Sequence, residues 1–202
     1  MLPTTSPLYQ LFSSFGVFAV TEIEQILTHF KFKAYKKGTI LVNFGEINDK
    51  MYFIETGILR EFSYQDQDQD QDQDQDQTIT HWIMPENNFE YLVDSFLEQK
   101  PSTIALEVIE NAKIWVITKT NIDKLYVEFP QLNLIGRLMT EQYLKKYEVY
   151  ISMLRLSPEK RLAWFESYHS ELANRVSVEY IASYLHIHRV TLSKIRSKRG
   201  KS

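Results

Sequence analysis

The 202-residue chain has 44% hydrophobic residues and a formal net charge of −3, which suffices for one large domain or two small ones. It contains no cysteine, which excludes disulfide bridges, iron–sulfur clusters and a cysteine nucleophile and fits a reducing compartment. No apolar run reaches the about 18 residues of a membrane helix, and residues 1–21 lack the basic start of a targeting peptide. We therefore expect a cytoplasmic protein without a membrane segment.

The negative net charge conceals a basic carboxyl-terminal segment. Six of the 26 acids are the Asp residues of the Asp-Gln repeat at residues 65–77, and removing them changes the balance from −3 to +3. By contrast, no acid interrupts the bases of the last segment, which are Arg189, Lys194, Arg196, Lys198, Arg199 and Lys201. Such a segment is either a solvated tail or the electrostatic footprint of a nucleic-acid binder.

The first 118 residues predict helices followed by strands. In the first 30 residues apolar side chains recur at helical spacing, at Leu8, Leu11, Phe12, Phe15, Ile23, Ile26 and Leu27. Residues 38–64 and 78–118 then contain short runs rich in β-branched and aromatic residues, which predict an antiparallel all-β unit. The Asp-Gln repeat between two of these strands has no apolar residue, so residues 65–77 are interpreted as a disordered loop.

After Asn121 the pattern is helical, and Pro130 predicts the start of a long helix. Its apolar stripe consists of Leu132, Ile135, Met139, Tyr143, Tyr147, Tyr150 and Leu154. A stripe of about 35 Å exceeds what one flank of a small β domain needs to cover, so we expect dimerisation through it. A long core helix within a single chain is the alternative.

Residues 155–202 predict a separate helical unit, in which Ser157 is an N-cap and Pro158 the first helical residue. Within it, Glu179–Arg196 fits a helix-turn-helix, with apolar or small residues where two crossing helices share a core, at Ile181, Ala182, Leu185, Ile187, Leu192 and Ile195. Ser177 is the predicted N-cap of the first helix. His186 stands where the turn usually has Gly in a left-handed conformation. An ordinary helical hairpin is the alternative.

In a major groove the second helix would present its amino-terminal and outward residues to the bases. Arg189 would grip a guanine edge, Lys194 would reach a base or phosphate, and Val190 would meet a thymine methyl. Phosphate contacts are expected from the helix margin and the residues beyond it, which are Thr191, Ser193, Arg196, Lys198 and Arg199.

Two segments resemble a known family. Residues 33–57, with Gly38, Leu41, Gly45, Tyr52, Ile54 and Gly57, resemble the start of the β-roll of cyclic-nucleotide-binding domains. Residues 180–196 resemble the helix-turn-helix of Crp/Fnr transcription regulators, and the order of elements also matches. The resemblance implies an α+β fold with a β-roll and its amino-terminal helices at 1–120, a linking and dimerisation helix at 121–154 and a DNA-binding domain at 155–202. It also implies a homodimer that binds a palindromic operator in double-stranded DNA and contacts RNA polymerase.

The chain departs from the family members that bind cyclic AMP, which use a Gly-Glu pair and an Arg-Ser/Thr pair. Here Tyr91-Leu92 and Ser102-Thr103 stand at those places. The missing arginine would forfeit about 1.5–3 kcal/mol per charge-assisted hydrogen bond, and Glu90 and Asp94 would repel the anion. We therefore expect no control by cyclic AMP. The candidate lining of a pocket for another, unknown effector is Phe89, Tyr91, Leu92, Ser102 and Thr103.

Two other classes of protein are weighed against a DNA-binding regulator. A metal-dependent cupin enzyme would need a His-x-His pair in the β unit, but His186 and His188 lie outside it and His81 stands alone. No phosphate loop or catalytic triad motif is present either, so we expect no enzymatic activity, cofactor or metal. The second alternative is a β-roll sensor or scaffold that has lost DNA binding, against which the basic second helix argues.

Overall fold

The structure, a computed structural model, describes residues 6–64 and 78–199, so the predicted loop at 65–77 lies outside the described residues. The chain divides into two compact units. Unit 1 comprises Met1–Glu61 and Met84–Glu141, and unit 2 comprises Phe62–Ile83 and Gln142–Ser202. The division differs from the predicted domains, because residues 62–64 and 78–83 of a β-hairpin, here called the hairpin tip, group with the carboxyl-terminal helices and the long helix is divided between the units.

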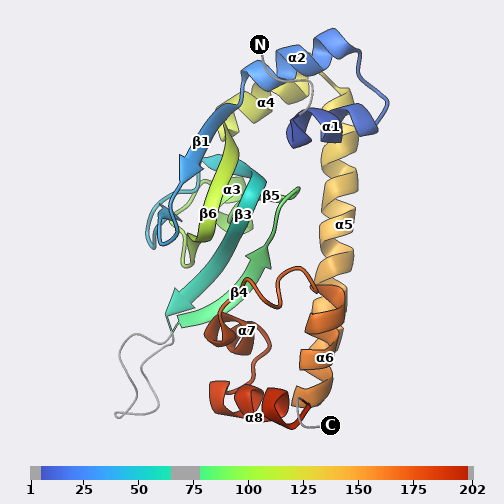
Figure 1. Ribbon diagram of the computed structural model, residues 1–202. Coiled ribbons are helices and arrows are strands. Elements are labelled where there is room, and N and C mark those ends of the chain that lie inside the picture. Colours follow the sequence, from blue (N-terminus) through green and yellow to red (C-terminus); the bar gives the residue numbers. More distant parts are fainter. Residues whose placement is uncertain (1–5, 65–77, 200–202) are drawn as a thin grey trace. The chain divides into compact units, whose positions relative to one another are not determined.

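Two short helices begin unit 1, as the apolar spacing predicts (Figure 1). In α1 (Pro7–Ser14) the hydroxyl of the N-cap Ser6 accepts a hydrogen bond from Tyr9 N–H at 3.2 Å. At the start of α2 (Val20–Thr28) Ala19 N–H donates to the Glu22 carboxylate at 2.7 Å. The apolar faces of both helices are buried in the core of the unit, through Leu8, Phe12, Ile23, Ile26 and Leu27.

The described strands form one sheet in the order β1-β6-β3-β4, with β2 paired to β6 and β5 to β3. The strands are β1 (Lys31–Tyr35), β2 (Ile40–Val42), β3 (Lys50–Tyr64), β4 (Thr78–Met84), β5 (Phe89–Glu90) and β6 (Ala105–Thr118). The pairings of β1 and β2 with β6, and of β5 with β3, are antiparallel, which confirms the predicted antiparallel unit. β1 begins before the predicted strands, since exposed Lys31 and Lys33 give it no apolar run.

One glycine of the family-like pattern is required by close packing between strands. Gly57 in β3 has a φ of +97°, a conformation that other residues rarely adopt. A Cβ atom there would lie 2.7 Å from both Cα and Cβ of Ala112 in β6. Any side chain at position 57 would therefore force β3 and β6 apart.

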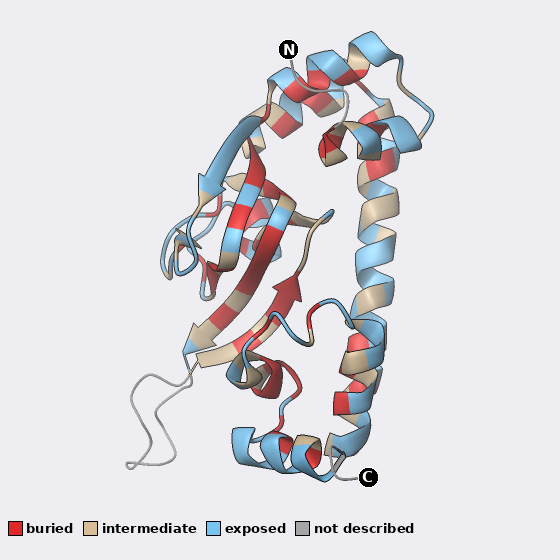
Figure 2. Ribbon diagram, in the orientation of Figure 1, coloured by how far each residue is buried: buried red, intermediate tan, exposed pale blue. Residues whose placement is uncertain are grey.

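Three helices complete unit 1. The short α3 (Val93–Glu98) lies inside the segment predicted as all-β. α4 (Lys119–Glu128) begins after Thr118, whose hydroxyl accepts a hydrogen bond from Asn121 N–H, and Phe129 and Pro130 separate it from α5 (Gln131–Met153). Leu132 and Ile135 in the first turns of α5 are buried in the unit 1 core, and Figure 2 shows the helix change from red to blue along its length.

Unit 2 contains α6 (Pro158–Tyr168), α7 (Val178–Tyr184) and α8 (Arg189–Arg199) as well as the hairpin tip. α6 begins where the sequence predicts, with extended backbone at Ser157 and Pro158 in the first turn. Its apolar side, Leu162 and Phe165, is fully buried. Both α6 and α7 pack against α8.

Candidate nucleic-acid interface

The turn between α7 and α8 has the geometry of a helix-turn-helix. The Ser177 hydroxyl accepts a hydrogen bond from Tyr180 N–H at 3.2 Å, which confirms the predicted N-cap. His186 has a φ of +51°, so it adopts the left-handed conformation that glycine usually supplies at this position. At the start of α8, Val190 N–H donates to His188 Nδ1 at 3.3 Å.

The two helices share a core at every position that the sequence predicts. Each of the six side chains is at most 7% exposed, and these are Ile181, Ala182, Leu185, Ile187, Leu192 and Ile195. Leu192 and Ile195 are one turn apart on α8, so they fix which side of that helix faces the protein. The opposite side of α8 is left to the solvent.

The exposed side of α8 carries most of the residues predicted to contact DNA. Arg189, Val190, Thr191, Ser193, Lys194 and Lys198 are all exposed. Arg196 is only partly exposed and its Nε lies 3.7 Å from a carboxylate oxygen of Glu166 on α6. The side chain of Arg199 lies outside the described part. The exposed face is therefore basic and polar, with Val190 as its apolar member. Figure 2 shows most of α8 as exposed.

The end of α7 is held by donors from two other helices of unit 2. The Arg161 guanidinium on α6 donates to the carbonyls of Leu185 and His186 at 3.1 Å each. The Tyr150 hydroxyl on α5 donates to the carbonyl of Tyr184 at 3.0 Å. Carbonyls at a helix end have no partner within the helix, so these bonds satisfy them and fix the turn. Sequence reasoning did not single out Arg161 or assign this bond to Tyr150.

The hairpin tip also contacts α7, a contact that the sequence did not predict. Thr80 N–H donates to the Ser183 hydroxyl at 2.8 Å, and that hydroxyl donates to the Thr78 carbonyl at 3.2 Å. The neighbouring Trp82 is 8% exposed and packs against Tyr184 with 6.1 Å between ring centroids. The hairpin tip is thus a packed part of the unit that carries the helix-turn-helix.

Burial lowers the pKa of three histidines of unit 2, His81, His169 and His186, and so favours their uncharged form. It lowers the pKa of His169 to about 4, an effect that Glu171 opposes and Lys146 reinforces. Burial also lowers the pKa of His81 on the hairpin, and the charge of His186 lowers it further. For His186 itself burial again lowers the pKa, together with the charge of Arg161.

Unit 1 contains a cluster of charged side chains within its strands. Arg60 of β3 is 3% exposed, and its guanidinium lies 3.1 Å from the Glu107 carboxylate on β6. Burial raises the pKa of the next residue, Glu61, to about 7, an effect that its hydrogen bond with Glu90 partly offsets. Charged residues within an otherwise apolar strand, Ile58-Leu59-Arg60-Glu61-Phe62, were the sequence signal for this cluster.

The residues predicted to line an effector pocket have packing roles in unit 1. Phe89 packs against Phe53 with 5.1 Å between ring centroids, and Tyr91 packs against Phe96 at 4.7 Å. Leu92 is buried, and its N–H donates to the Asn48 side chain at 2.7 Å. On the following loop the Ser102 hydroxyl donates to the carbonyl of Ile104 at 2.7 Å, while Thr103 is exposed.

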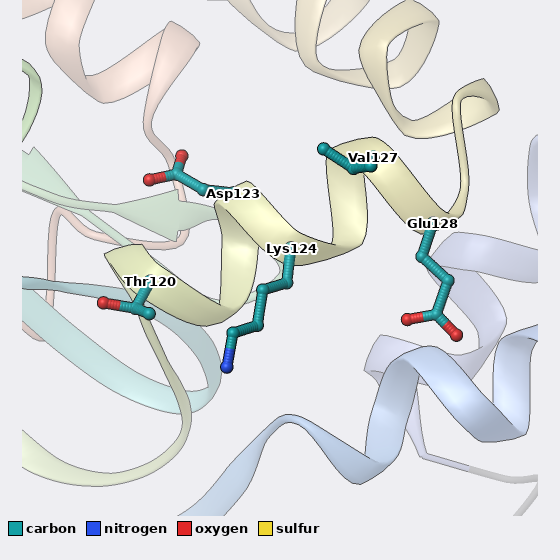
Figure 3. A pocket seen from close by; sticks show the side chains of 5 residues that line it. All are labelled: Thr120, Asp123, Lys124, Val127 and Glu128. Carbon is teal, nitrogen blue, oxygen red and sulfur yellow. The ribbon is translucent and has the colours of Figure 1, made fainter.

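An open hollow of about 490 Å³ lies elsewhere, along α4. Its lining residues are Thr120, Asp123, Lys124, Val127 and Glu128, all of one helix (Figure 3). Their side chains spread in different directions rather than converging on one point. The hollow therefore has no set of polar groups arranged around a ligand.

The predicted dimerisation stripe of α5 is divided by the structure. Leu132, Ile135 and Tyr150 are at most 8% exposed within the single chain, and Met139 packs against the unit 1 core. Leu154 lies just beyond the helix and is partly exposed. The exposed apolar side chains of α5 are Leu134, Tyr143, Leu144, Tyr147 and Val149, at 36–57%. The middle of the helix, rather than its whole length, is thus apolar and open to solvent.

The described part of the chain contains neither a candidate metal site nor a candidate membrane-spanning helix. Residues 6–64 and 78–199 contain no group of three His, Asp or Glu side chains placed to hold a metal ion. None of the helices in those ranges is both long and apolar enough to cross a membrane.

Comparison with solved structures relates this arrangement to a known fold. The regulator CLP from Xanthomonas campestris, described as responsive to c-di-GMP, has a TM-score of 0.66 at 15% identity, covering 91% of this chain and 92% of its own. A CooA mutant from Carboxydothermus hydrogenoformans has a TM-score of 0.65 at 18% identity, covering 100% of this chain and 87% of its own. A protein from Eubacterium rectale, described as a regulator of the Crp/Fnr family, has a TM-score of 0.65 at 18% identity, covering 95% and 88%.

No family model matches the sequence, and neither does any curated protein. The resemblance to Crp/Fnr regulators is confirmed at the level of the fold, which is α+β with an antiparallel β-roll, a long helix and a helix-turn-helix. At 15–18% identity the likeness shows the fold alone.

Proposed function

We propose that the chain is a DNA-binding transcription regulator of the Crp/Fnr type. The observation that carries the proposal is the two-sided character of α8, which buries Leu192 and Ile195 and exposes Arg189, Val190 and Lys194. A helix held in this way can enter the major groove of DNA with its basic side chains facing the base pairs. The alternative of a sensor that has lost DNA binding does not account for a basic, uncovered second helix.

The test begins with the selection of a duplex from a random pool by the full-length protein. Arg189→Ala should then weaken binding to that duplex by about 1–3 kcal/mol and relax the preference at one base position in each half-site. Lys198→Ala should weaken all duplexes similarly and reduce the salt dependence, because a phosphate contact releases a counterion. Lys145→Ala, an exposed base on α5, is the matched control. Failure to select any duplex would leave the sensor as the better reading.

We further propose that the protein is a homodimer, paired in parallel through the middle of α5. Leu144 and Tyr147, 57% and 47% exposed, lie one turn apart on this helix. Parallel pairing would place two helix-turn-helix units side by side, which suits a palindromic operator with half-sites about one turn of DNA apart. Leu144→Glu with Tyr147→Glu should sediment as a monomer. Val127→Glu, at an 83% exposed residue of α4, should not change the sedimentation of the wild type. A wild-type monomer at micromolar concentration would contradict the dimer.

Cyclic AMP is not the proposed effector. Ser102 and Thr103 stand where family members that bind it have an Arg-Ser/Thr pair, and the buried Arg60 lies beside Glu107 rather than facing a free anion site. We expect no heat of binding for cyclic AMP or cyclic GMP at micromolar concentration. Contact with RNA polymerase, which the family resemblance implies, is part of the same proposal. Pull-down of polymerase by the protein bound to its selected duplex tests it.

A further inference from the structure

At the outer edge of β4, a side chain of α7 forms hydrogen bonds of the kind that a neighbouring strand would form. β4 is the last strand in the order of the described sheet, so its outer backbone edge faces no further strand there. At that edge the Ser183 hydroxyl of α7 contacts both Thr80 N–H and the Thr78 carbonyl, at 2.8 and 3.2 Å. Thr80 is completely buried. One hydroxyl group therefore joins the first residues of β4 to the end of α7.

An aromatic cluster reinforces this join. The Trp82 ring lies 5.8 Å from Tyr143, 5.5 Å from Tyr150 and 6.1 Å from Tyr184, measured between ring centroids. Tyr150 and Tyr184 are themselves stacked at 4.8 Å. Trp82 thus contacts α5 and α7 at once, at edge and tilted geometries that aromatic pairs favour.

The residues involved lie at the part of the helix-turn-helix that sets the angle between its helices. Ser183 and Tyr184 are the last two residues of α7, and Arg161 holds the two carbonyls that follow. The hairpin contacts α7 and leaves the side chains of Arg189, Val190 and Lys194 on α8 exposed. The contact therefore braces the turn without covering the proposed DNA-binding face.

We propose that Thr78, Thr80 and Trp82, here called the clasp, position α7 and thereby the recognition helix α8. The inference rests on the proposed function and extends it. The clasp residues contact no DNA. They act through Ser183 and Tyr184, so they are positioning residues for sequence-specific binding.

Amide hydrogen exchange of the full-length protein tests the brace without DNA. Ser183→Ala removes both hydrogen bonds to the clasp at little change in volume, and we expect exchange at residues 184–187 to become about tenfold faster. The matched control is Ser167→Ala on α6, where the hydroxyl bonds only to the carbonyl of Trp164 among the described contacts. It should leave exchange at residues 184–187 unchanged.

DNA binding separates positioning from a general loss of folding. For Ser183→Ala and Trp82→Ala we expect about tenfold weaker binding to the duplex selected by the wild type, with binding to random duplexes and the salt dependence unchanged. If part of the protein were simply unfolded, the affinities for the selected duplex and for random duplexes would fall by the same factor. Trp82→Phe, which keeps an aromatic ring against the tyrosines, should restore most of the ratio between specific and random binding.

Three outcomes decide the matter. Wild-type exchange rates in Ser183→Ala would overturn the brace, and faster exchange with an unchanged specific-to-random ratio would overturn its positioning role. If the wild type selects no duplex, the proposed function fails, while the exchange measurement still decides whether the clasp braces α7.

Discussion

The two units have cores of different chemistry and should respond to pH in opposite directions. The unit 1 core is mainly aliphatic side chains and phenylalanines, such as Ile26 and Phe53. The core of unit 2 contains rings with polar atoms, such as Trp82, Tyr184 and His169, around Phe165. Apolar burial is independent of pH, whereas a buried ring that can ionise stabilises the fold only in its neutral form. The acid-sensitive unit is therefore the one that carries the helix-turn-helix.

The largest expected effect is in the apolar core. Phe53→Ala removes a completely buried ring in contact with Phe89 and should lower the free energy of unfolding by about 3–5 kcal/mol. Denaturant titration measures the loss, and Val127→Ala at an exposed position should cost less than about 0.5 kcal/mol. Residue-level amide exchange shows where the loss falls. An equal increase in the amide exchange rates of β3 and α7 would show that the two cores are not independent.

Acid should destabilise unit 2 through His169. Its folded pKa of about 4 lies below the ordinary histidine value of 6.5, so the folded state binds fewer protons between these values. The stabilising contribution is present above pH 6.5 and is lost as the pH falls toward 4, by about 2 kcal/mol after allowance for partial exposure. In the wild type, amide protection in α6 and α7 should fall over this pH range. In His169→Phe that fall should disappear. If the wild-type protection of these helices is flat from pH 7 to 4.5, His169 is not the acid-sensitive group.

Alkaline pH should destabilise unit 1 through Glu61. Its folded pKa of about 7 exceeds the ordinary glutamate value of 4.5, so its stabilising contribution is present below pH 4.5 and is lost as the pH rises through 7. Because Glu61 is partly exposed as a residue and bonded to Glu90, we expect a loss of only about 1–2 kcal/mol. Glu61→Gln should therefore be more stable than the wild type at pH 8 and similar to it at pH 4.5. A variant less stable than the wild type at pH 8 would contradict this sign.

The smallest expected effect concerns one polar atom of the unit 2 core, the hydroxyl oxygen of Tyr150. Tyr150→Phe removes the hydroxyl that donates to the Tyr184 carbonyl, and it keeps the ring that stacks on the Tyr184 ring. The free energy of unfolding should fall by about 1 kcal/mol, with the change confined to amides of α7 and the turn. Tyr168→Phe, at an exposed ring on α6, is the matched control.

The helix-turn-helix could be predicted from sequence because its signals are local. The Ser177 cap, the left-handed His186 and the buried face that includes Leu192 all lie within residues 177–195. The long helix was predicted from its spacing, but its burial was not, since the residues that cover Leu132 come from distant helices.

The parts that escaped prediction depend on contacts between distant residues. Thr80 and Ser183 are 103 residues apart, and neither residue type is unusual at its position. β1 was not predicted, because its five residues are too short a run and none of them is fully buried. The pairing of Arg60 with Glu107 likewise needs the register of two strands, which side-chain spacing within one strand does not contain.

The Ser183 hydroxyl also has a consequence for solubility. The open edge of a sheet can pair with the same edge of another molecule, and proteins commonly cover such edges or place charges along them. At Thr78–Thr80 the Ser183 hydroxyl of α7 bonds to this backbone edge. A protein in which α7 moves away from β4 would expose this backbone, so we expect concentrated Ser183→Ala to form β-rich aggregates sooner than the wild type.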